Sequence, residues 1–533
     1  MKQQSTGRGF AYLSIAELLV KVMSVIYVPL LVRILGDVGH GIYLVSYEAF
    51  TLIYVLTNEG IQRGIAKLIA ELHAKGNPRD ALRAFRLSRT LLILGGLFAS
   101  LLLFFLAPYI ARTSATPQAT LSIQALAPTV LITAILSAYR GYFLGRSFIS
   151  KNAISKIVEQ LFNVIISLVA AYFLMKIGIE YGVAGGTLGT SLGALVAVLL
   201  LIYEYRKGRL NKVRRKDQDE NAYYHSNKEL IKKLLSYAFP ITLSAGMLNI
   251  GNFIDMFIVN NRLLDAGLTF TLAKTAFSQL ARFKNLVVVP NTFIVSLASV
   301  LLPGIAAANA VGNKEEVKRK VNFSVKVLFT ISIPSFIGLV ILADPIYAVL
   351  YPGRGGADLL KYGAVTVIFL GFIQVQNVIF QGLSKFYWGA GTMLVGIICK
   401  LTLNYFLVAM PDINIYGAVA SYFMNYFVPA IINHYLITKV LKYDMKIFRN
   451  ALSPLGSAIA MGITIFLLNR LFIMIDGSYM VESFLTLINI LIGGTVYLVT
   501  LLFTGGITKS DLKDMSPRLY KLVPSGIRQK MKA

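Results

Sequence analysis

Long apolar runs, separated by short polar segments, occupy most of the chain. Fourteen of them approach or exceed the ~20 residues that a helix needs to cross a bilayer, and the second continues as a polar helix to about residue 75. The pattern predicts an all-α polytopic membrane protein with fourteen transmembrane helices. The expected spans are 10–32, 41–58, 90–111, 121–143, 153–175, 182–203, 236–258, 271–302, 323–343, 362–382, 388–410, 415–438, 450–473 and 483–504.

The composition supports a membrane protein and argues against an enzyme. Hydrophobic residues make up 56% of the 533 residues and charged residues 14%, whereas soluble domains carry about 25% charged residues. The longest polar stretch, about 204–235, is too short for a catalytic domain. The GxxxxGK[ST] phosphate loop is absent, and the four histidines show no metal-ligand spacing. We therefore expect no enzymatic activity, no metal and no cofactor.

The net charge of +27 follows from 52 basic and 25 acidic residues, and its distribution predicts an orientation. Basic residues concentrate in alternate polar segments such as YEYRKGRLNKVRRK and GNKEEVKRK. By the positive-inside rule, both termini then lie in the cytoplasm. The charge is thus mainly a topology signal with some attraction to anionic membrane lipids, and we expect no nucleic-acid partner. The segments expected outside hold only Arg33, Arg112, Lys176, Arg262, Arg354 and Lys361.

The chain contains an internal repeat with an offset near 236 residues. GNPRDALRAFRLSR after the second span matches GNKEEVKRKVNFSVK after the eighth, and two further matches pair Gly145 with Gly382 and Gly182 with Gly417. The repeat is six spans long, so both copies have the same orientation in the membrane. We expect two six-helix lobes related by a pseudo-two-fold axis along the membrane normal, plus two extra C-terminal helices.

These observations predict four regions. The first six-helix lobe with its basic cytoplasmic loop covers 1–235, and the second lobe covers 236–445. Two additional transmembrane helices cover 446–505, and a basic cytoplasmic tail covers 506–533.

Four basic residues fall near the middle of predicted spans: Lys21, Arg282, Lys284 and Lys400. A basic side chain at that depth costs about 2.5–3.5 kcal/mol unless it faces protein or water. Such residues can neutralise acids on neighbouring helices and hold a bundle together, and Glu17 can pair with Lys21 at i,i+4. The alternative is a wet, positively charged cavity that binds an anionic, phosphate-bearing substrate.

Four other positions are weaker candidates. Arg63, on the polar continuation of the second span, lies either on a solvated face or at the cytoplasmic mouth of the cavity. Asp255 lies in the seventh span. Pro29 and Pro290 interrupt helical hydrogen bonding, either as ordinary kinks or as hinges during alternating access.

Three segments resemble the MurJ-like lipid II flippases: GIQRGIAKLIAELHAKGN (60–77), YRGYFLGRSFISKNAISKIVEQ (139–160) and SVLLPGIAAANAVGNKEE (299–316). The stage V sporulation protein B and polysaccharide-exporter branch of the multidrug/oligosaccharidyl-lipid/polysaccharide superfamily is the most similar. The resemblance implies a flippase that moves an undecaprenyl-diphosphate-linked cell-wall precursor from the inner to the outer leaflet of the bacterial plasma membrane. It places Lys21, Lys284 and Asp255 at cavity positions of the family. The chain has lysine at both 21 and 284 where the family has arginine, which weakens bidentate phosphate binding and leaves a different lipid-linked glycan open.

Two alternative functions remain. A cation-coupled multidrug exporter of the same superfamily would need carboxylates deep in the membrane. A membrane glycan-polymerising enzyme would need an acidic or histidine cluster at an outer loop, where only isolated aspartates occur. We expect a monomer whose partners are a lipid-linked oligosaccharide, membrane lipids, and a coupling ion or the membrane potential.

Overall fold

The computed structural model describes residues 6–210, 213, 218–219, 223–351, 355–443, 445–473 and 479–506. These residues are almost entirely helical, and no strand occurs among them. The expected basic tail lies outside the described residues, apart from Gly506. The fold is that of an all-α, multi-pass membrane protein, as the sequence predicts.

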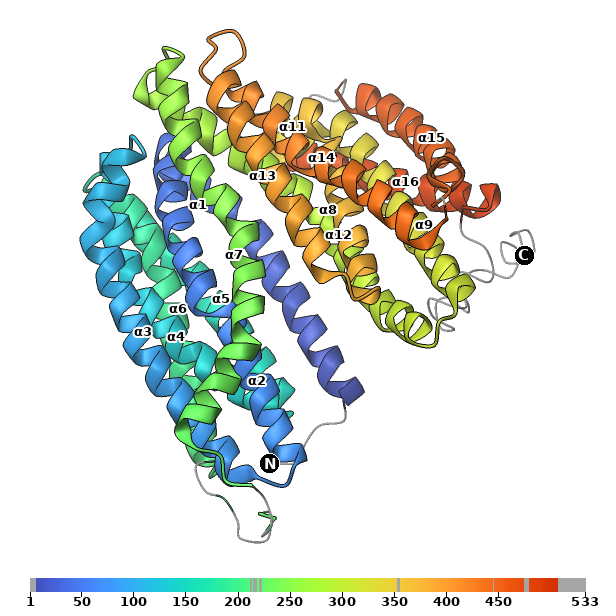
Figure 1. Cartoon of the computed structure of the whole chain (residues 1–533). Helices are drawn as coiled ribbons and strands as arrows, with labels where there is room; N and C mark the ends of the chain where they lie inside the picture. The colour runs from blue at the N-terminus through green and yellow to red at the C-terminus, as the bar shows by residue number, and fades with distance from the viewer. Residues whose placement is uncertain are drawn as a thin grey trace. The chain divides into compact units, whose positions relative to one another are not determined.

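The chain divides into two compact units, 1–278 and 279–533, and the division falls inside one long helix, α8. By packing, α7 belongs to the first unit, and the lobe boundary at residue 235 stays a prediction. The helices up to the division are α1 (Thr6–Thr57), α2 (Glu59–Ala74), α3 (Pro78–Thr113), the short 3₁₀ helix η1 (Pro117–Ala119), α4 (Thr120–Gly145), α5 (Ile149–Leu174), α6 (Ile179–Lys207), α7 (Asn227–Asp265) and α8 (Phe270–Ala310) (Figure 1).

The second unit contains the rest of α8 and eight further helices. They are α9 (Lys314–Ile341), α10 (Ala343–Leu350), α11 (Ala357–Gly363), α12 (Thr366–Gly382), α13 (Phe386–Leu407), α14 (Ile415–Leu441), α15 (Ile447–Ile473) and α16 (Tyr479–Thr504). The additional pair α15 and α16 pack against each other, and α15 also packs on α9.

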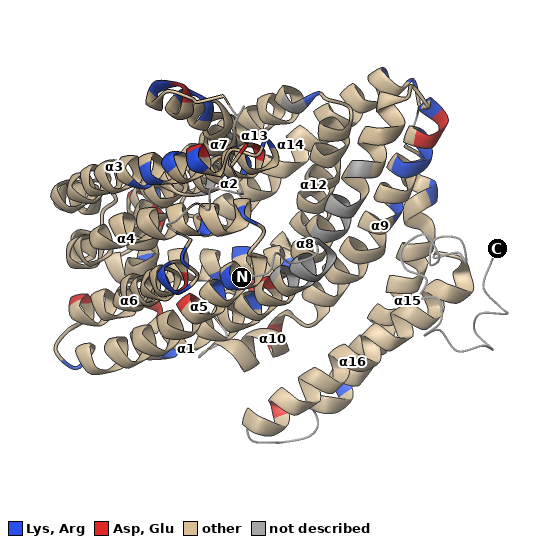
Figure 2. Cartoon of the chain, turned by 90° about the horizontal axis from the view of Figure 1, so that it is seen from below, with Lys and Arg blue, Asp and Glu red and all other residues tan. Residues whose placement is uncertain are grey.

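Each of the fourteen expected spans has a helical counterpart, although ten helices, or eleven with one bent pair, pass a strict test of length and apolar composition among the described residues. The count from this test is lower than fourteen partly because the first two expected spans lie on one continuous helix, α1. The tenth span is broken into α11 and α12, which are bent by 53°. Charged side chains gather toward helix ends and leave long uncharged stretches, as in α9, whose charges lie mostly in its first turns (Figure 2).

The break in α1 lies at Gly36, not at the proline that the sequence singles out. Gly36 has φ 67° and ψ 176°, a combination that only glycine adopts readily. Pro29 lies inside the helical part before this break, and Pro290 lies inside α8, which continues through it. The hinge role of both prolines stays a prediction.

The turns at the repeat positions have the same geometry in both copies. Gly76 and Gly312 have φ values of 66° and 69°, and each is followed by an asparagine whose side chain caps the next helix. Ser147 and Ser384, two residues after the matched pair Gly145 and Gly382, have φ values of 59° and 58°. Local backbone geometry thus supports the repeat that the sequence predicts.

Small residues let helices in the first unit approach closely. Along α6, Gly185, Gly189 and Gly193 face α5, and a Cβ atom at Gly189 would lie 2.3 Å from the carbonyl oxygen of Asn163. Without a hydrophobic force between helices in lipid, such close backbone contact is a main source of stability. The spacing of these glycines along α6 therefore determines how closely α5 and α6 pack.

The segment before α7 is fastened to the start of α3 by Asp80, whose side chain is 1% exposed. The Asp80 carboxylate accepts hydrogen bonds from the backbone N–H of His225 at 2.8 Å, from its Nδ1 at 3.0 Å and from Arg83 at 2.8 Å. Asn77 also donates to Asp80 at 3.1 Å and to the carbonyl of Tyr223 at 2.8 Å. This network anchors the entrance to α7 on the first unit.

Candidate functional site: a basic cluster in the second unit

Two of the predicted basic residues converge on one aromatic ring. The Nζ atom of Lys284, on α8, lies 5.2 Å from the ring centroid of Tyr422, on α14. The Nζ atom of Lys400, on α13, lies 5.8 Å from the same centroid. Lys400 is 2% exposed and Lys284 is half-buried. The structure therefore brings together two cations that are 116 residues apart in sequence and were not expected to be neighbours.

Helix packing positions this basic cluster of Lys284, Lys400 and Tyr422. Phe283 contacts the Tyr422 ring edge-on, with 5.7 Å between the ring centroids. On the other side, α13 and α14 pack closely, and a Cβ atom at Gly396 would lie 2.4 Å from the carbonyl oxygen of Asn425. Tyr422 is thus held between α8 and α13, where its electron-rich face attracts both ammonium groups.

Two buried asparagines lie on α8 and α14, the helices that carry Lys284 and Tyr422. Asn425 lies one turn along α14 from Tyr422, and Asn291 lies two turns along α8 from Lys284, on the same helix face. Within the part of the chain that the structure describes, the Oδ1 atom of each is buried without a hydrogen-bond partner. Because burying an unsatisfied amide costs about 1–3 kcal/mol, these groups favour a site that holds water or a polar ligand. The sequence analysis did not single out Tyr422 or either asparagine. A polar asparagine within an apolar span, seven residues after Lys284, could have pointed to Asn291.

Arg282 lies apart from the basic cluster, since residues two apart on a helix point to different faces. It is fully buried, its guanidinium lies 4.7 Å from the ring centroid of Tyr351, and it donates to the carbonyl of Gly355 at 3.4 Å. Arg282 therefore contacts other groups than Lys284 does, and its part in substrate binding stays a prediction.

The basic residues predicted for the first unit are exposed. Lys21 on α1 and Arg63 on α2 have no hydrogen bond or ion pair with any residue that the structure describes. Glu17 pairs with Lys156 of α5, so the expected i,i+4 pair with Lys21 is absent. Both cations are accessible to solvent or to a ligand.

Three other charged residues of the first unit are buried. Arg140 pairs with Glu159 at 2.7 Å, as a basic residue that holds a bundle together should. Lys274, which sequence reasoning missed, is buried and donates to Thr116 at 2.5 Å and Asn260 at 2.7 Å. Asp255 is buried on α7, at 2% exposure. No cluster of metal-ligating side chains occurs in the part of the chain that the structure describes.

Curated relatives cover nearly the whole chain. Stage V sporulation protein B of Bacillus subtilis (strain 168) is 26% identical over 456 residues, which are 85% of this chain and 87% of that protein. Lipid II flippase MurJ of the same organism is 24% identical over 518 residues, which are 92% and 94% of the two chains.

Solved structures show the same fold. The inward closed conformation of a lipid II flippase MurJ matches with a TM-score of 0.68 at 16% identity and covers 92% of this chain and 97% of its own. An inward-facing multidrug resistance MATE family transporter of the MOP superfamily matches with a TM-score of 0.67 at 18% identity. The match covers 81% of this chain and 99% of the transporter chain. The profile of the polysaccharide biosynthesis protein family matches residues 6–309, more than half of the chain. The chain therefore belongs to the polysaccharide biosynthesis protein family and has the fold of a MOP-superfamily transporter.

Proposed function

We propose that this protein is a flippase for a lipid-linked cell-wall precursor that carries an undecaprenyl-diphosphate group. It moves this substrate from the inner to the outer leaflet of the bacterial plasma membrane by alternating access. The convergence of Lys284 and Lys400 on Tyr422 is the observation that carries the proposal. The names of two relatives, a lipid II flippase and a sporulation protein, support this substrate class.

The charge of the cluster suits a diphosphate. Lys284 and Lys400 carry the same charge and lie near one ring, so their ammonium groups repel each other. An anionic headgroup that binds both relieves the repulsion and gains charge-assisted hydrogen bonds. The neighbouring amides Asn291 and Asn425 supply further polar contacts to such a headgroup. Catalytic chemistry is not needed for this task, so the protein acts as a transporter.

The first unit offers the exposed cations Lys21 and Arg63, to which we assign capture of the headgroup before it reaches the cluster.

Outward movement of an anion is favoured by a membrane potential that is negative inside, by up to ~2.3 kcal/mol per charge per 100 mV. The potential therefore supplies a driving force in the proposed direction. Lysine binds phosphate as a point charge and lacks the planar fork of arginine, so the cluster selects for a charged headgroup and does not specify the glycan.

The test is depletion of the protein, followed by extraction and mass spectrometry of the lipid-linked intermediates. Accumulation of lipid II or a related undecaprenyl-diphosphate-linked glycan in the inner leaflet is the expected result. Normal levels of every such intermediate, combined with increased sensitivity to cationic drugs, would contradict the proposal and favour an exporter.

A further inference from the structure

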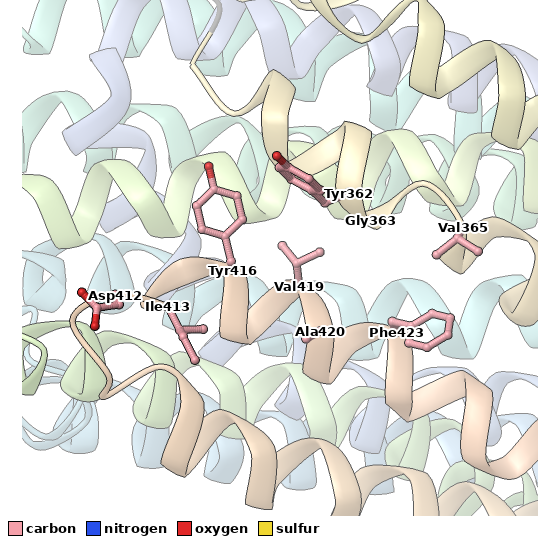
Figure 3. A pocket seen from close by; sticks show the side chains of 9 residues that line it. All are labelled: Tyr362, Gly363, Val365, Asp412, Ile413, Tyr416, Val419, Ala420 and Phe423. Carbon is pink, nitrogen blue, oxygen red and sulfur yellow. The ribbon is translucent and has the colours of Figure 1, made fainter.

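A cavity of about 700 Å³ lies on the second unit between α11, the start of α12 and α14 (Figure 3). This volume is within the range of small-molecule sites. The cavity does not include the basic cluster, since none of Lys284, Lys400 and Tyr422 lines it. All the residues that line the cavity belong to the second compact unit.

The two ends of the cavity differ in chemistry. Tyr362 and Tyr416 stand next to each other at one end, with 5.7 Å between ring centroids and 82° between ring planes, and Asp412 lies beyond Tyr416 (Figure 3). Val365 and Phe423 lie at the other end. Tyr416 and Phe423 are seven residues apart on α14, or about 10 Å along the helix. The cavity is therefore polar where α14 starts and apolar further along.

The polar end is negatively charged. Asp412 is the only charged residue among those that line the cavity, and its carboxylate has no hydrogen bond or ion pair within the described ranges. Lys361, beside Tyr362, does not neutralise Asp412. The Lys361 ammonium instead pairs with Asp344 at 2.9 Å and with Asp358 at 3.3 Å. Tyr362 and Tyr416 are 72% and 41% exposed, so both residues are accessible to a ligand.

We propose that this cavity binds an amphiphile with an ammonium head and a hydrocarbon chain. The ammonium faces Asp412 and the exposed faces of the two tyrosines, where charge attraction and cation–π interactions add. The chain extends over Val365 toward Phe423 and buries apolar surface. An anionic head is disfavoured by the carboxylate, so the preference is opposite to that of the basic cluster. The inference does not depend on the proposed flippase function.

The experiment uses the full-length protein in nanodiscs and a photoreactive alkyl-trimethylammonium probe with a diazirine on its chain, followed by peptide mapping. We expect labelling within residues 357–423. The Asp412→Asn variant should bind about fivefold more weakly, and Ala420→Trp, which fills the cavity from its wall, should abolish labelling. The matched control is Asp358→Asn, which removes a nearby carboxylate that is already paired with Lys361.

Two arms identify the source of the ligand. Phosphatidylethanolamine in the nanodisc should compete with the probe if the natural ligand is a membrane lipid. If it does not, competition by decyltrimethylammonium from solution indicates a soluble organic cation. Equal labelling by a hydroxyl-headed analogue of the same length, or full labelling of a correctly folded Asp412→Asn variant, would overturn the proposal. Thermal melting of each variant establishes that it is folded.

Discussion

A lysine ammonium inside a membrane protein needs a partner, and Lys284 and Lys400 both use the ring of Tyr422. Arg140 shows the other solution, a direct ion pair with Glu159. The shared contact with one ring of α14 makes Lys284 and Lys400 the candidate binding residues.

Replacing both lysines with glutamine (Lys284→Gln with Lys400→Gln) should reduce translocation about tenfold or more, because the diphosphate loses both cationic contacts. A fluorescent undecaprenyl-diphosphate-linked substrate in proteoliposomes measures the rate. Tyr422→Leu should lower it as well. The control is Lys176→Gln, which removes a lysine that also contacts aromatic rings, at 5.1 and 5.5 Å, but lies exposed after α5. An unchanged rate in the double variant would remove the basic cluster from the mechanism.

Gly36→Ala should destabilise the protein by about 1–3 kcal/mol, because alanine does not readily adopt the backbone conformation at the break in α1. Gly95→Ala is the matched control, since both glycines have open space around a new Cβ atom but Gly95 lies inside a regular helix. There the substitution should be neutral or stabilising by up to about 1 kcal/mol. Thermal unfolding in detergent compares the two variants, and equal melting temperatures would show that Gly36 carries no strain.

Asp80→Asn should loosen the attachment of the segment before α7, because the neutral amide loses charge-assisted hydrogen bonds from His225 and Arg83. Hydrogen exchange of residues 223–230 should become faster. Glu316→Gln is the control at the equivalent turn of the second copy, where the carboxylate pairs with Arg319 and Lys320 of its own helix. If exchange near residue 225 is as slow as in the wild type, Asp80 is not the anchor.

At the scale of elements, glycines on one face of α6 determine how closely it packs on α5. Gly189→Ala should lower the melting temperature, because the new Cβ atom would lie 2.3 Å from the Asn163 carbonyl oxygen. Gly494→Ala in α16, where no atom lies within 4 Å, should have no such effect. A fluorescence-based thermal shift assay distinguishes the two outcomes. Equal shifts would mean that α5 and α6 can separate without cost.

Sequence reasoning located the spans and the repeat because both depend on local signals. Apolar runs identify spans, and turn residues such as Gly76 and Gly312 determine the turns that follow α2 and α8. The break at Gly36 was not predicted, since a glycine between two apolar runs also suits an ordinary loop. Tyr422 was missed because its role arises only when α8 and α13 pack against α14. Depth along a helix predicts which cations lie within a span, but it does not predict which face of the helix each one occupies.

At the scale of the whole molecule, the orientation in the membrane can be tested directly. The positive-inside pattern places the start of α7 in the cytoplasm and the loop before α14 outside. In a Cys399→Ser background, Asp412→Cys should react with a membrane-impermeant maleimide on intact cells, whereas Lys228→Cys should react only after permeabilisation. Both positions are exposed, so burial does not confound the comparison. The reverse pattern would invert the topology and, with it, the proposed direction of transport.

The paired turns at Gly76 and Gly312, and at Ser147 and Ser384, indicate that the gene arose by duplication of a shorter ancestor. The six-span repeat predicts one orientation for both copies, so the duplicated half is expected to have paired with an identical copy before fusion. Asp80 now anchors the segment before α7, whereas its counterpart Glu316 pairs with residues of its own helix. The two copies thus use the same capping turn for different contacts.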